Sequence, residues 1–288
     1  MADKPFDIAV VGAGPAGLSA ALTARVRNKT VALFEHLDHS PKLQKAHVIH
    51  NYIGLPATPG KDMIKQLADH CLAAGPTLIK EKVTNIFAGD TFTLLTPHNT
   101  YEARAVIISI GVVSSALIAG EKDLIGKGVS YCATCDGMLY RDKPVAVIAY
   151  TPEGEHEANF LGEICPVVYF LPQYKTDFQP SQPTVKVISA RIQSVIGSDE
   201  VTGLMTDAGE LKVDGIFILR QADPAETLLP ELEMDGPFVK VDRKQLTSVP
   251  GVYAAGDCTG KPWQIARATG EGLTAVLNAI EYIDSAHK

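Results

Sequence analysis

Short apolar runs recur along the chain and alternate with stretches of helical character. One run lies at residues 8–11, and the next, at 30–34, follows a segment rich in Ala and Leu. Two more runs lie in the middle of the chain, at 144–149 and 166–171. Runs of this length that are apolar at nearly every position are typical of strands buried on both faces, as in parallel sheets covered by helices. The pattern predicts an α/β fold.

The first of these strands leads directly into Gly12-Ala13-Gly14-Pro15-Ala16-Gly17. Between a strand and a helix, this spacing is the fingerprint of a dinucleotide site. Gly12 permits the tight turn, Gly14 lets the backbone approach a pyrophosphate, and Gly17 allows close helix packing, while the helix N-terminus supplies amide donors. The second apolar run ends in Glu35, whose carboxylate suits a ribose hydroxyl and repels a 2′-phosphate. The segment predicts FAD or NAD and argues against NADP.

A second glycine turn lies near the C-terminal end. An apolar strand beginning at residue 251 ends in Gly256 and Asp257, and a helix is predicted to begin near Trp263. This pattern resembles the second flavin signature of the two-dinucleotide-binding disulfide oxidoreductases. The resemblance implies FAD, with Asp257 holding the ribityl chain and the helix dipole stabilising the anionic reduced flavin. Taken alone, the segment also fits a surface turn with a capping Asp, and Trp263 fits either stacking beside the flavin or ordinary packing.

The positions of the two signatures predict a discontinuous domain organisation. Residues 1–115 and 240–288 form the FAD-binding domain, and residues 116–239 form an inserted redox domain. Both domains are Rossmann-like, and the chain crosses between them near 109–115 and 239–249. The resemblance implies seven further flavin-binding residues: Pro15, Ala16, Asn51, Gly111, Gln264, Ile265 and Ala266.

Composition limits the classes of function. The chain has 288 residues, of which 46% are hydrophobic, so it can bury a large core. Its net charge of −7 argues against non-specific binding to nucleic acid or to an anionic membrane. The N-terminal segment lacks a signal-peptide pattern, and no apolar span is long enough for a membrane helix. The chain is predicted to be cytoplasmic.

Only two of the five cysteines, Cys132 and Cys135, form a C-x-x-C pair. Such a pair closes a small disulfide ring whose thiols exchange readily. A zinc ribbon would need a second pair, which the sequence lacks, so no metal site is predicted.

The segment Cys132-Ala133-Thr134-Cys135-Asp136-Gly137 resembles the active site of low-molecular-weight thioredoxin reductases. The resemblance implies that Cys135 faces the flavin, Cys132 attacks the thioredoxin disulfide and Asp136 moves the proton. Capping of the turn before Gly137 is the alternative role for Asp136. The family resemblance also implies a homodimer.

The pattern of that family breaks after the redox motif. Where a second glycine loop usually holds NADPH, this chain reads Ala149-Tyr150-Thr151-Pro152-Glu153-Gly154. Pro152 lacks an amide donor, and Tyr150 and Thr151 add bulk where glycine is needed. Three carboxylates surround the predicted helix start: Glu153, Glu155 and Glu157. At about 6 Å and an effective dielectric near 20, each opposes a phosphate charge by roughly 2–3 kcal/mol.

The usual arginine cluster after the next strand is also missing, since residues 172–175 read Pro-Gln-Tyr-Lys. Two determinants of NADPH binding are therefore absent, and the sequence predicts a reductase that does not use NADPH. The chain resembles the ferredoxin-dependent flavin thioredoxin reductases, a branch of the family that is independent of pyridine nucleotides. The resemblance implies that two reduced ferredoxins reduce FAD, FAD reduces the Cys132–Cys135 disulfide, and the dithiol reduces thioredoxin.

Several alternatives remain open at this point. Flavodoxin could replace ferredoxin as donor. A remodelled middle domain could bind NADH or a second flavin, and a non-enzymatic flavin redox sensor would carry the same motifs. Two basic runs are candidate docking cations or simply solvated faces: Arg25, Arg27 and Lys29, and Lys42 with Lys45.

Overall fold

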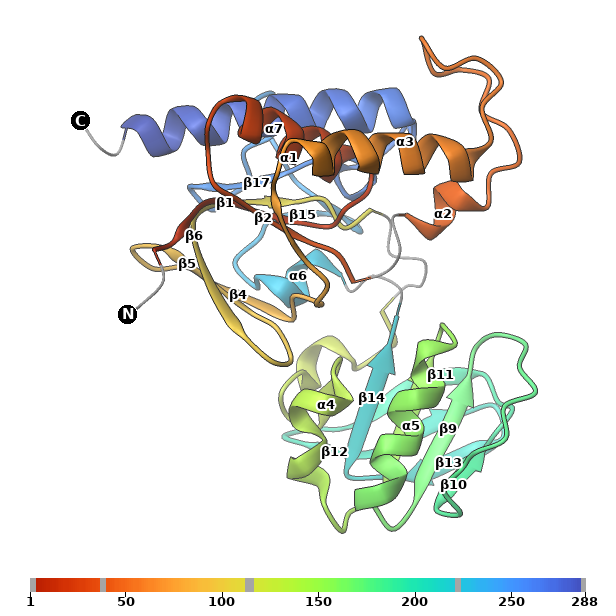
Figure 1. Ribbon diagram of the computed structural model, residues 1–288. Coiled ribbons are helices and arrows are strands. Elements are labelled where there is room, and N and C mark those ends of the chain that lie inside the picture. The colour runs from red at the N-terminus through yellow and green to blue at the C-terminus, as the bar shows by residue number, and fades with distance from the viewer. Residues whose placement is uncertain (1–3, 37–39, 112–116, 221–223, 286–288) are drawn as a thin grey trace. The chain divides into compact units, whose positions relative to one another are not determined.

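In the computed structural model the chain divides into two compact units. The first consists of Met1–Val113 and Ala222–Lys288, and the second of Ser114–Gln221. The structure describes residues 4–36, 40–111, 117–220 and 224–285, without the side chains of Pro41 and Cys135. One unit is thus built from both ends of the chain, and the other is inserted into it (Figure 1).

The first unit is centred on a mixed sheet with the strand order β3-β2-β1-β6-β5-β4, in which β17 also pairs with β6. Its strands are β1 (Phe6–Val11), β2 (Val31–Phe34), β3 (Thr77–Ile79), β4 (Asn85–Phe87), β5 (Phe92–Leu95), β6 (Thr100–Ile108) and β17 (Val252–Ala254). The pairings among β1, β2, β3, β6 and β17 are parallel, and β4 and β5 are attached in antiparallel fashion. The parallel part carries the glycine turns at its carboxyl edge.

Helices cover both faces of this sheet. They are α1 (Pro15–Val26), α2 (Pro41–Gln44), α3 (Gly60–Ala73), α6 (Ala225–Leu228) and α7 (Ile265–Ser285), with the short 3-10 helix η3 (Asp257–Thr259) after β17. One apolar core joins α1, α3 and α7 to the sheet. A second core lies on the opposite face, under β4, β5 and α6. Burial on both faces explains why β1 and β2 are continuous apolar runs.

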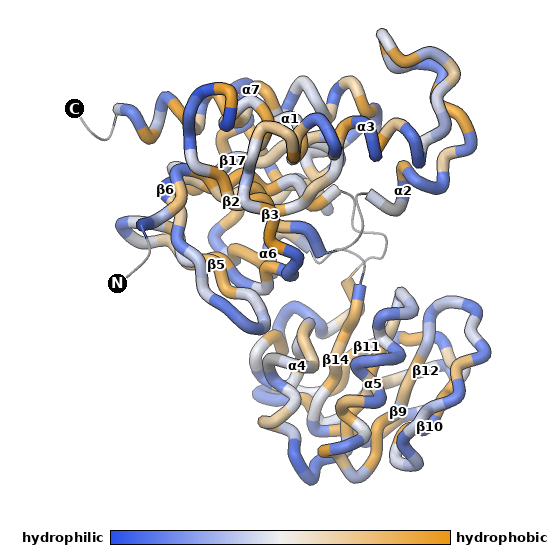
Figure 2. The backbone as a smooth tube through the Cα atoms, in the orientation of Figure 1, coloured by the Kyte–Doolittle hydropathy of each residue, from blue (hydrophilic) through white to orange (hydrophobic). Residues whose placement is uncertain are grey.

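The second unit has a parallel sheet with the order β10-β9-β8-β14-β7. Its strands are β7 (Val129–Ser130), β8 (Val145–Ala149), β9 (Val168–Pro172), β10 (Val185–Val187) and β14 (Gly215–Leu219). An antiparallel sheet accompanies it, formed by β11 (Ile192–Gly197), β12 (Val201–Thr206) and β13 (Gly209–Lys212). The helical elements are η1 (Lys122–Leu124), α4 (Ala133–Asp136), η2 (Gly137–Tyr140) and α5 (Glu153–Ile164). Figure 2 shows hydrophobic residues along the central strands of this unit, such as β9 and β14.

The return crossing lies earlier than the predicted boundary at residue 240. Ala225, Leu228 and Val239 are buried in the core of the first unit, together with Phe34 and Ile108. The hairpin of β15 (Met234–Asp235) and β16 (Phe238–Val239) belongs to the same unit. The assignment of residues 224–239 to the middle domain is therefore wrong, because their apolar side chains complete the first core.

No helix in the described ranges is long and apolar enough to cross a membrane.

Candidate flavin site and redox motif

The glycine loop after β1 needs its glycines for different reasons. Gly12 has φ +108°, and a Cβ there would lie 2.5 Å from the carbonyl oxygen of Ser109. A Cβ on Gly17 would overlap the carbonyl oxygen of Gly12. The nearest atom to a Cβ on Gly14 would instead be the Cβ of Ser40, 3.9 Å away. Gly12 and Gly17 are thus required by the fold, whereas Gly14 borders open space where a pyrophosphate could approach.

The surroundings of this loop also suit a dinucleotide. α1 begins at Pro15, and its N-terminus has no side-chain cap, so its first-turn amides face the region that Gly14 leaves open. The amide of Gly12 donates to the carbonyl of Phe34 at 3.0 Å, which places the end of β2 beside the loop. Glu35, the next residue, is 4% exposed. The predicted ribose acceptor therefore lies next to the predicted pyrophosphate cradle.

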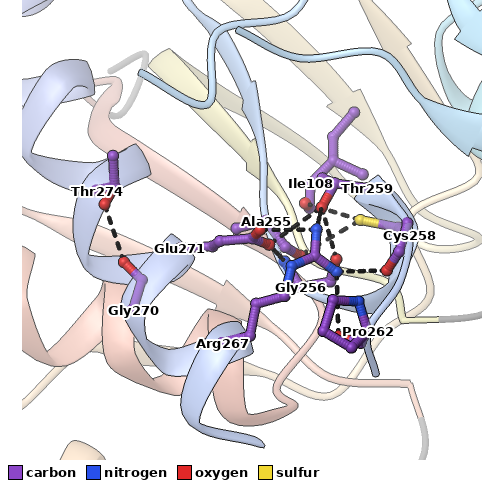
Figure 3. Close-up of polar contacts among 11 residues, drawn as sticks. Ile108, Ala255, Gly256, Cys258, Thr259, Pro262, Arg267, Gly270, Glu271 and Thr274 are labelled. Carbon is purple, nitrogen blue, oxygen red and sulfur yellow. Dashed lines mark hydrogen bonds and ion pairs between the residues drawn. The ribbon is translucent and has the colours of Figure 1, made fainter. Parts of the chain in front are cut away.

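The C-terminal turn is held by a polar network on the first turns of α7 (Figure 3). Gly256, with φ +86°, donates its amide to Glu271 Oε2 at 2.8 Å. The Thr259 hydroxyl donates to the same oxygen at 3.0 Å. Arg267 pairs with Glu271 at 2.7 Å and donates to the carbonyl of Gly260. The network fixes the backbone on both sides of Asp257.

The two flavin signatures meet through the packing of α1 against α7. A Cβ on Gly256 would lie 2.9 Å from the Cβ of Ala16. The Ser19 hydroxyl donates to the carbonyl of Thr269 at 2.8 Å. Segments that are distant in sequence, with Ser19 and Thr269 separated by 250 positions, therefore form one site region in which Ala16 and Gly256 are neighbours.

A third segment, around α2, joins this region. Lys42 Nζ lies 2.9 Å from Asp257 Oδ2. Asn51 donates to Gln264 Oε1 at 2.8 Å. Of the remaining predicted residues, Gly111 has φ +76°, and Ile265 and Ala266 begin α7. The structure thus pairs Asn51 with Gln264 and Lys42 with Asp257, and a flavin-binding role for these residues stays a prediction.

The network behind the turn is only partly visible in the sequence. Arg267 and Glu271 stand four residues apart on α7, the spacing at which opposite charges pair along a helix. This spacing predicts the ion pair. It does not predict that Glu271 also accepts a hydrogen bond from the Gly256 amide, because that contact depends on how α7 packs.

The redox motif spans the end of β7, α4 and η2 in the second unit. Cys132 is disulfide-bonded, and the side chain of Cys135 lies outside the described part of the chain. Asp136 accepts a hydrogen bond from the buried Ser130 hydroxyl at 2.7 Å, and its side chain makes no cap bond to η2. The amide of Cys132 donates to the same hydroxyl oxygen at 3.1 Å. Ser130 therefore links the proposed proton carrier to the backbone of Cys132, which the capping alternative for Asp136 does not explain.

The other cysteines differ from this pair. Cys71, Cys165 and Cys258 are free and buried. Burial raises the pKa of Cys71 and of Cys165 to about 11, and that of Cys258 to about 12. These thiols are protonated at neutral pH and unsuited to exchange.

The turn between β8 and α5 is the segment in which the family resemblance predicts a second glycine loop. α5 begins directly after Pro152, with Glu153 and Glu155 in its first turn. Glu155 Oε1 accepts hydrogen bonds from Tyr174 at 2.9 Å and from Thr176 at 2.6 Å. Burial and this bond to Glu155 raise the pKa of Tyr174. The carboxylate is thus held at the helix N-terminus by side chains that follow β9, where arginines were expected.

A buried ion pair lies below Tyr150. Arg220 and Glu121 form a bidentate pair at 2.6 and 2.7 Å, with both side chains fully buried. Tyr131 donates to Glu121 at 2.8 Å, and the Arg220 guanidinium lies 5.3 Å from the centre of the Tyr150 ring. The Tyr150 ring therefore packs beside a buried ion pair.

Comparisons with known proteins show the family of this chain. The family model for pyridine nucleotide-disulphide oxidoreductases matches residues 6–149 and 182–272. A thioredoxin reductase from Treponema pallidum is 31% identical over 98% of this chain and 99% of its own. The crystal structure of a ferredoxin-flavin thioredoxin reductase from Clostridium acetobutylicum is 40% identical, covers 99% of both chains and superposes with a TM-score of 0.92. A thioredoxin reductase from Gloeobacter violaceus is 28% identical, covers 99% of this chain and 96% of its own, and has a TM-score of 0.81.

The chain belongs to the pyridine nucleotide-disulphide oxidoreductase family. Within it, the protein is a flavin disulfide oxidoreductase of the low-molecular-weight thioredoxin reductase type. FAD is the cofactor of this class, and the open space at Gly14, the uncapped α1 terminus and the buried Glu35 fit it.

Proposed function

We propose that this protein is a ferredoxin-dependent thioredoxin reductase that does not use NADPH. In the net reaction, two reduced ferredoxins, one thioredoxin disulfide and two protons give two oxidised ferredoxins and one thioredoxin dithiol. Bound FAD would supply both one-electron and two-electron chemistry, which would join one-electron donors to the disulfide.

The first unit holds the cofactor. Gly14 and the amides of α1 receive the pyrophosphate, and Glu35 accepts the ribose hydroxyl. Asp257, held in place by the turn that Glu271 fixes, binds the ribityl chain. The N-terminus of α7 provides positive potential to the reduced flavin.

The second unit carries out the exchange. Cys135 receives the electron pair, which opens its bond to Cys132. The Cys132 thiolate then attacks the thioredoxin disulfide, and Cys135 resolves the mixed disulfide. Asp136, positioned by Ser130, transfers the protons that the thiols gain and lose.

One observation carries the exclusion of NADPH: Glu155 is fixed at the start of α5. A carboxylate held by two hydroxyl donors cannot simply turn away from an incoming phosphate. Pro152 removes an amide from the same turn, and Tyr150 lies over the Arg220–Glu121 pair. The likeness to the ferredoxin-flavin thioredoxin reductase of Clostridium acetobutylicum supports ferredoxin as the electron donor.

An anaerobic mixing experiment tests the proposal. The purified flavoprotein is mixed separately with NADPH, NADH and reduced ferredoxin, and bleaching of the flavin absorbance is followed. We expect rapid bleaching by ferredoxin alone, followed by the appearance of thioredoxin thiols. Rapid bleaching by NADPH would refute the proposal, and bleaching by NADH would favour a remodelled nucleotide site.

A Cys132→Ser variant separates electron input from output. Its flavin should still bleach with reduced ferredoxin, because the donor acts on the first unit. No thioredoxin thiols should appear, because the attacking sulfur is missing. If the variant still reduces thioredoxin, the disulfide route is wrong.

A further inference from the structure

The single tryptophan lies between two cations that are far apart in sequence. Trp263 is 40% exposed and lies two residues before α7 begins. Lys42 Nζ lies 4.6 Å from the ring centre and Lys261 Nζ lies 5.3 Å from it. Both distances are within the range of cation–π interaction. The ring is therefore flanked by positive charge and is accessible to a partner.

This cluster adjoins the proposed flavin site. Lys42 also contacts Asp257, and Gln264, the residue after Trp263, is bonded to Asn51. The segments that contain Lys42 and Asn51 therefore contact the segment from Asp257 to Gln264 in the first unit. We call Lys42, Lys261 and Trp263 the tryptophan patch.

The charge of these two segments is unlike that of the chain. Residues 40–61 contain three lysines and two histidines but no Asp or Glu, and residues 258–270 contain Lys261 and Arg267 but no Asp or Glu. Asp62, Asp257 and Glu271 border these ranges, and the last two pair with Lys42 and Arg267. The protein as a whole has a net charge of −7. Lys42, Lys45 and Lys261 are exposed. An acidic partner that is repelled by most of this protein would meet a positive surface here.

In the other basic run, Arg25 and Lys29 are less available to a partner, because the Lys29 side chain is 18% exposed in its ion pair, whereas Lys42 remains 61% exposed in its pair with Asp257. Arg25 donates to the carbonyls of Ala74 and Lys29, and Lys29 pairs with Asp284. These cations hold the end of α1 against its neighbours. The tryptophan patch is therefore the better candidate for electrostatic docking.

Ferredoxins are usually acidic, and we propose that the tryptophan patch docks an acidic one-electron donor of this kind. This inference rests on the proposed function and identifies the surface at which its electron donor binds. Electron transfer falls steeply with distance, and the patch borders the turn that we assign to the flavin. An exposed aromatic anchor flanked by cations suits an interface in which charge accelerates the encounter and the ring supplies buried contact.

The test uses Lys261→Glu and Trp263→Ala in the holoenzyme, with reduced ferredoxin as the probe. Lys186→Glu is the control, because Lys186 lies 6.0 Å from the ring of Tyr169 in the second unit and is likewise a lysine paired with an aromatic ring. Flavin content, bleaching by dithionite and thioredoxin reduction by the dithionite-reduced enzyme are measured alongside. We expect these three readouts, and every rate of the control, to match those of the wild type.

With ferredoxin at low salt, Lys261→Glu should bleach about tenfold more slowly, and 0.5 M salt should remove most of the difference. Trp263→Ala should bleach about tenfold more slowly at both salt concentrations. Wild-type rates in both variants would overturn the docking site while leaving the proposed function intact. Slower thioredoxin reduction with normal ferredoxin rates would assign the patch to thioredoxin instead. Failure of ferredoxin to bleach the wild type would overturn both proposals.

Discussion

Ser130 shows how one hydroxyl connects the redox motif. Its oxygen lies 2.7 Å from the Asp136 carboxylate and accepts the amide of Cys132. The motif made Asp136 a candidate from sequence, because the C-x-x-C-D spacing is local. Ser130 was not a candidate, since serines are common before helices and only the fold shows where the hydroxyl points.

Replacement of Ser130 by Ala should slow thioredoxin reduction about tenfold, because a hydrogen bond to a charged group contributes about 1.5–3 kcal/mol and here orients the proton carrier. Ser130→Thr keeps the hydroxyl and should recover most of the rate. Asp136→Asn sets the lower limit, at about a hundredfold loss. Steady-state assays with reduced ferredoxin measure all three. A fully active Ser130→Ala enzyme would show that the bond does not position Asp136.

The three free cysteines should resist alkylation in the native protein. Their pKa values, raised by burial to about 11 for Cys71 and Cys165 and to about 12 for Cys258, leave almost no thiolate at pH 8. Mass spectrometry after iodoacetamide treatment of the native protein should find them unmodified, and treatment in urea should label all three. Labelling of any of them in the native protein would contradict their burial.

The raised pKa values of the same thiols predict that the stability of the protein falls at high pH. In the unfolded chain they ionise near the ordinary value of 9.0, whereas the fold keeps them protonated to about pH 11. Their contribution to stability is therefore fully present below pH 9 and is lost as the pH rises towards 11 and beyond. Urea midpoints measured between pH 8 and 10.5 should fall over this range. Substitution of Cys165 by Ala should make the decline shallower.

The turn from β1 into α1 was the most predictable element. A buried apolar run, a glycine triplet and an Ala-rich helix specify it through local geometry alone. The structure shows why individual positions in the loop need glycine. The space around each one is limited by atoms from other segments, such as the Ser109 carbonyl beside Gly12.

Two substitutions in this turn should have different effects. Gly14→Ala places its Cβ in open space, so the protein should fold but lose most of its FAD. Gly17→Ala drives its Cβ into the Gly12 carbonyl and should impair folding itself. Flavin-to-protein absorbance ratios and thermal melts of the apoproteins distinguish the two effects. Full flavin content in Gly14→Ala would argue against a pyrophosphate at this turn.

The inserted unit depends on contacts that join distant parts of the chain. Glu121 lies near the beginning of the second unit, and Arg220 lies near its end. Their bidentate ion pair therefore joins the two ends of the inserted segment. Burial by itself would lower the pKa of Arg220, and the bond to Glu121 raises it overall. The pair could not be predicted, because the two residues are 99 positions apart.

Removal of the Glu121 charge should destabilise the protein strongly. Glu121→Gln leaves Arg220 buried without its counter-ion, at a cost of about 3–5 kcal/mol. Asp207→Asn is the control, since its ion pair with Arg191 in the same unit is exposed and should contribute much less. Urea unfolding measures both. Equal losses of stability in the two variants would refute a special role for the buried pair.

Local patterns were sufficient for the fold class, both glycine turns and the redox motif, because strand burial, helix spacing and glycine conformation leave traces within a few residues. The loss of the second glycine loop could be recognised from the sequence for the same reason, because it is a local change in residue types. Other features join segments that are distant in sequence. They are the contact of Lys42 with Trp263, the hydrogen bond from the Gly256 amide to Glu271, and the packing of Ala225 in the core of the first unit. Such contacts depend on which surfaces pack together. The identity of an apolar residue or a lysine does not specify its distant partner, so only the folded structure shows the contact.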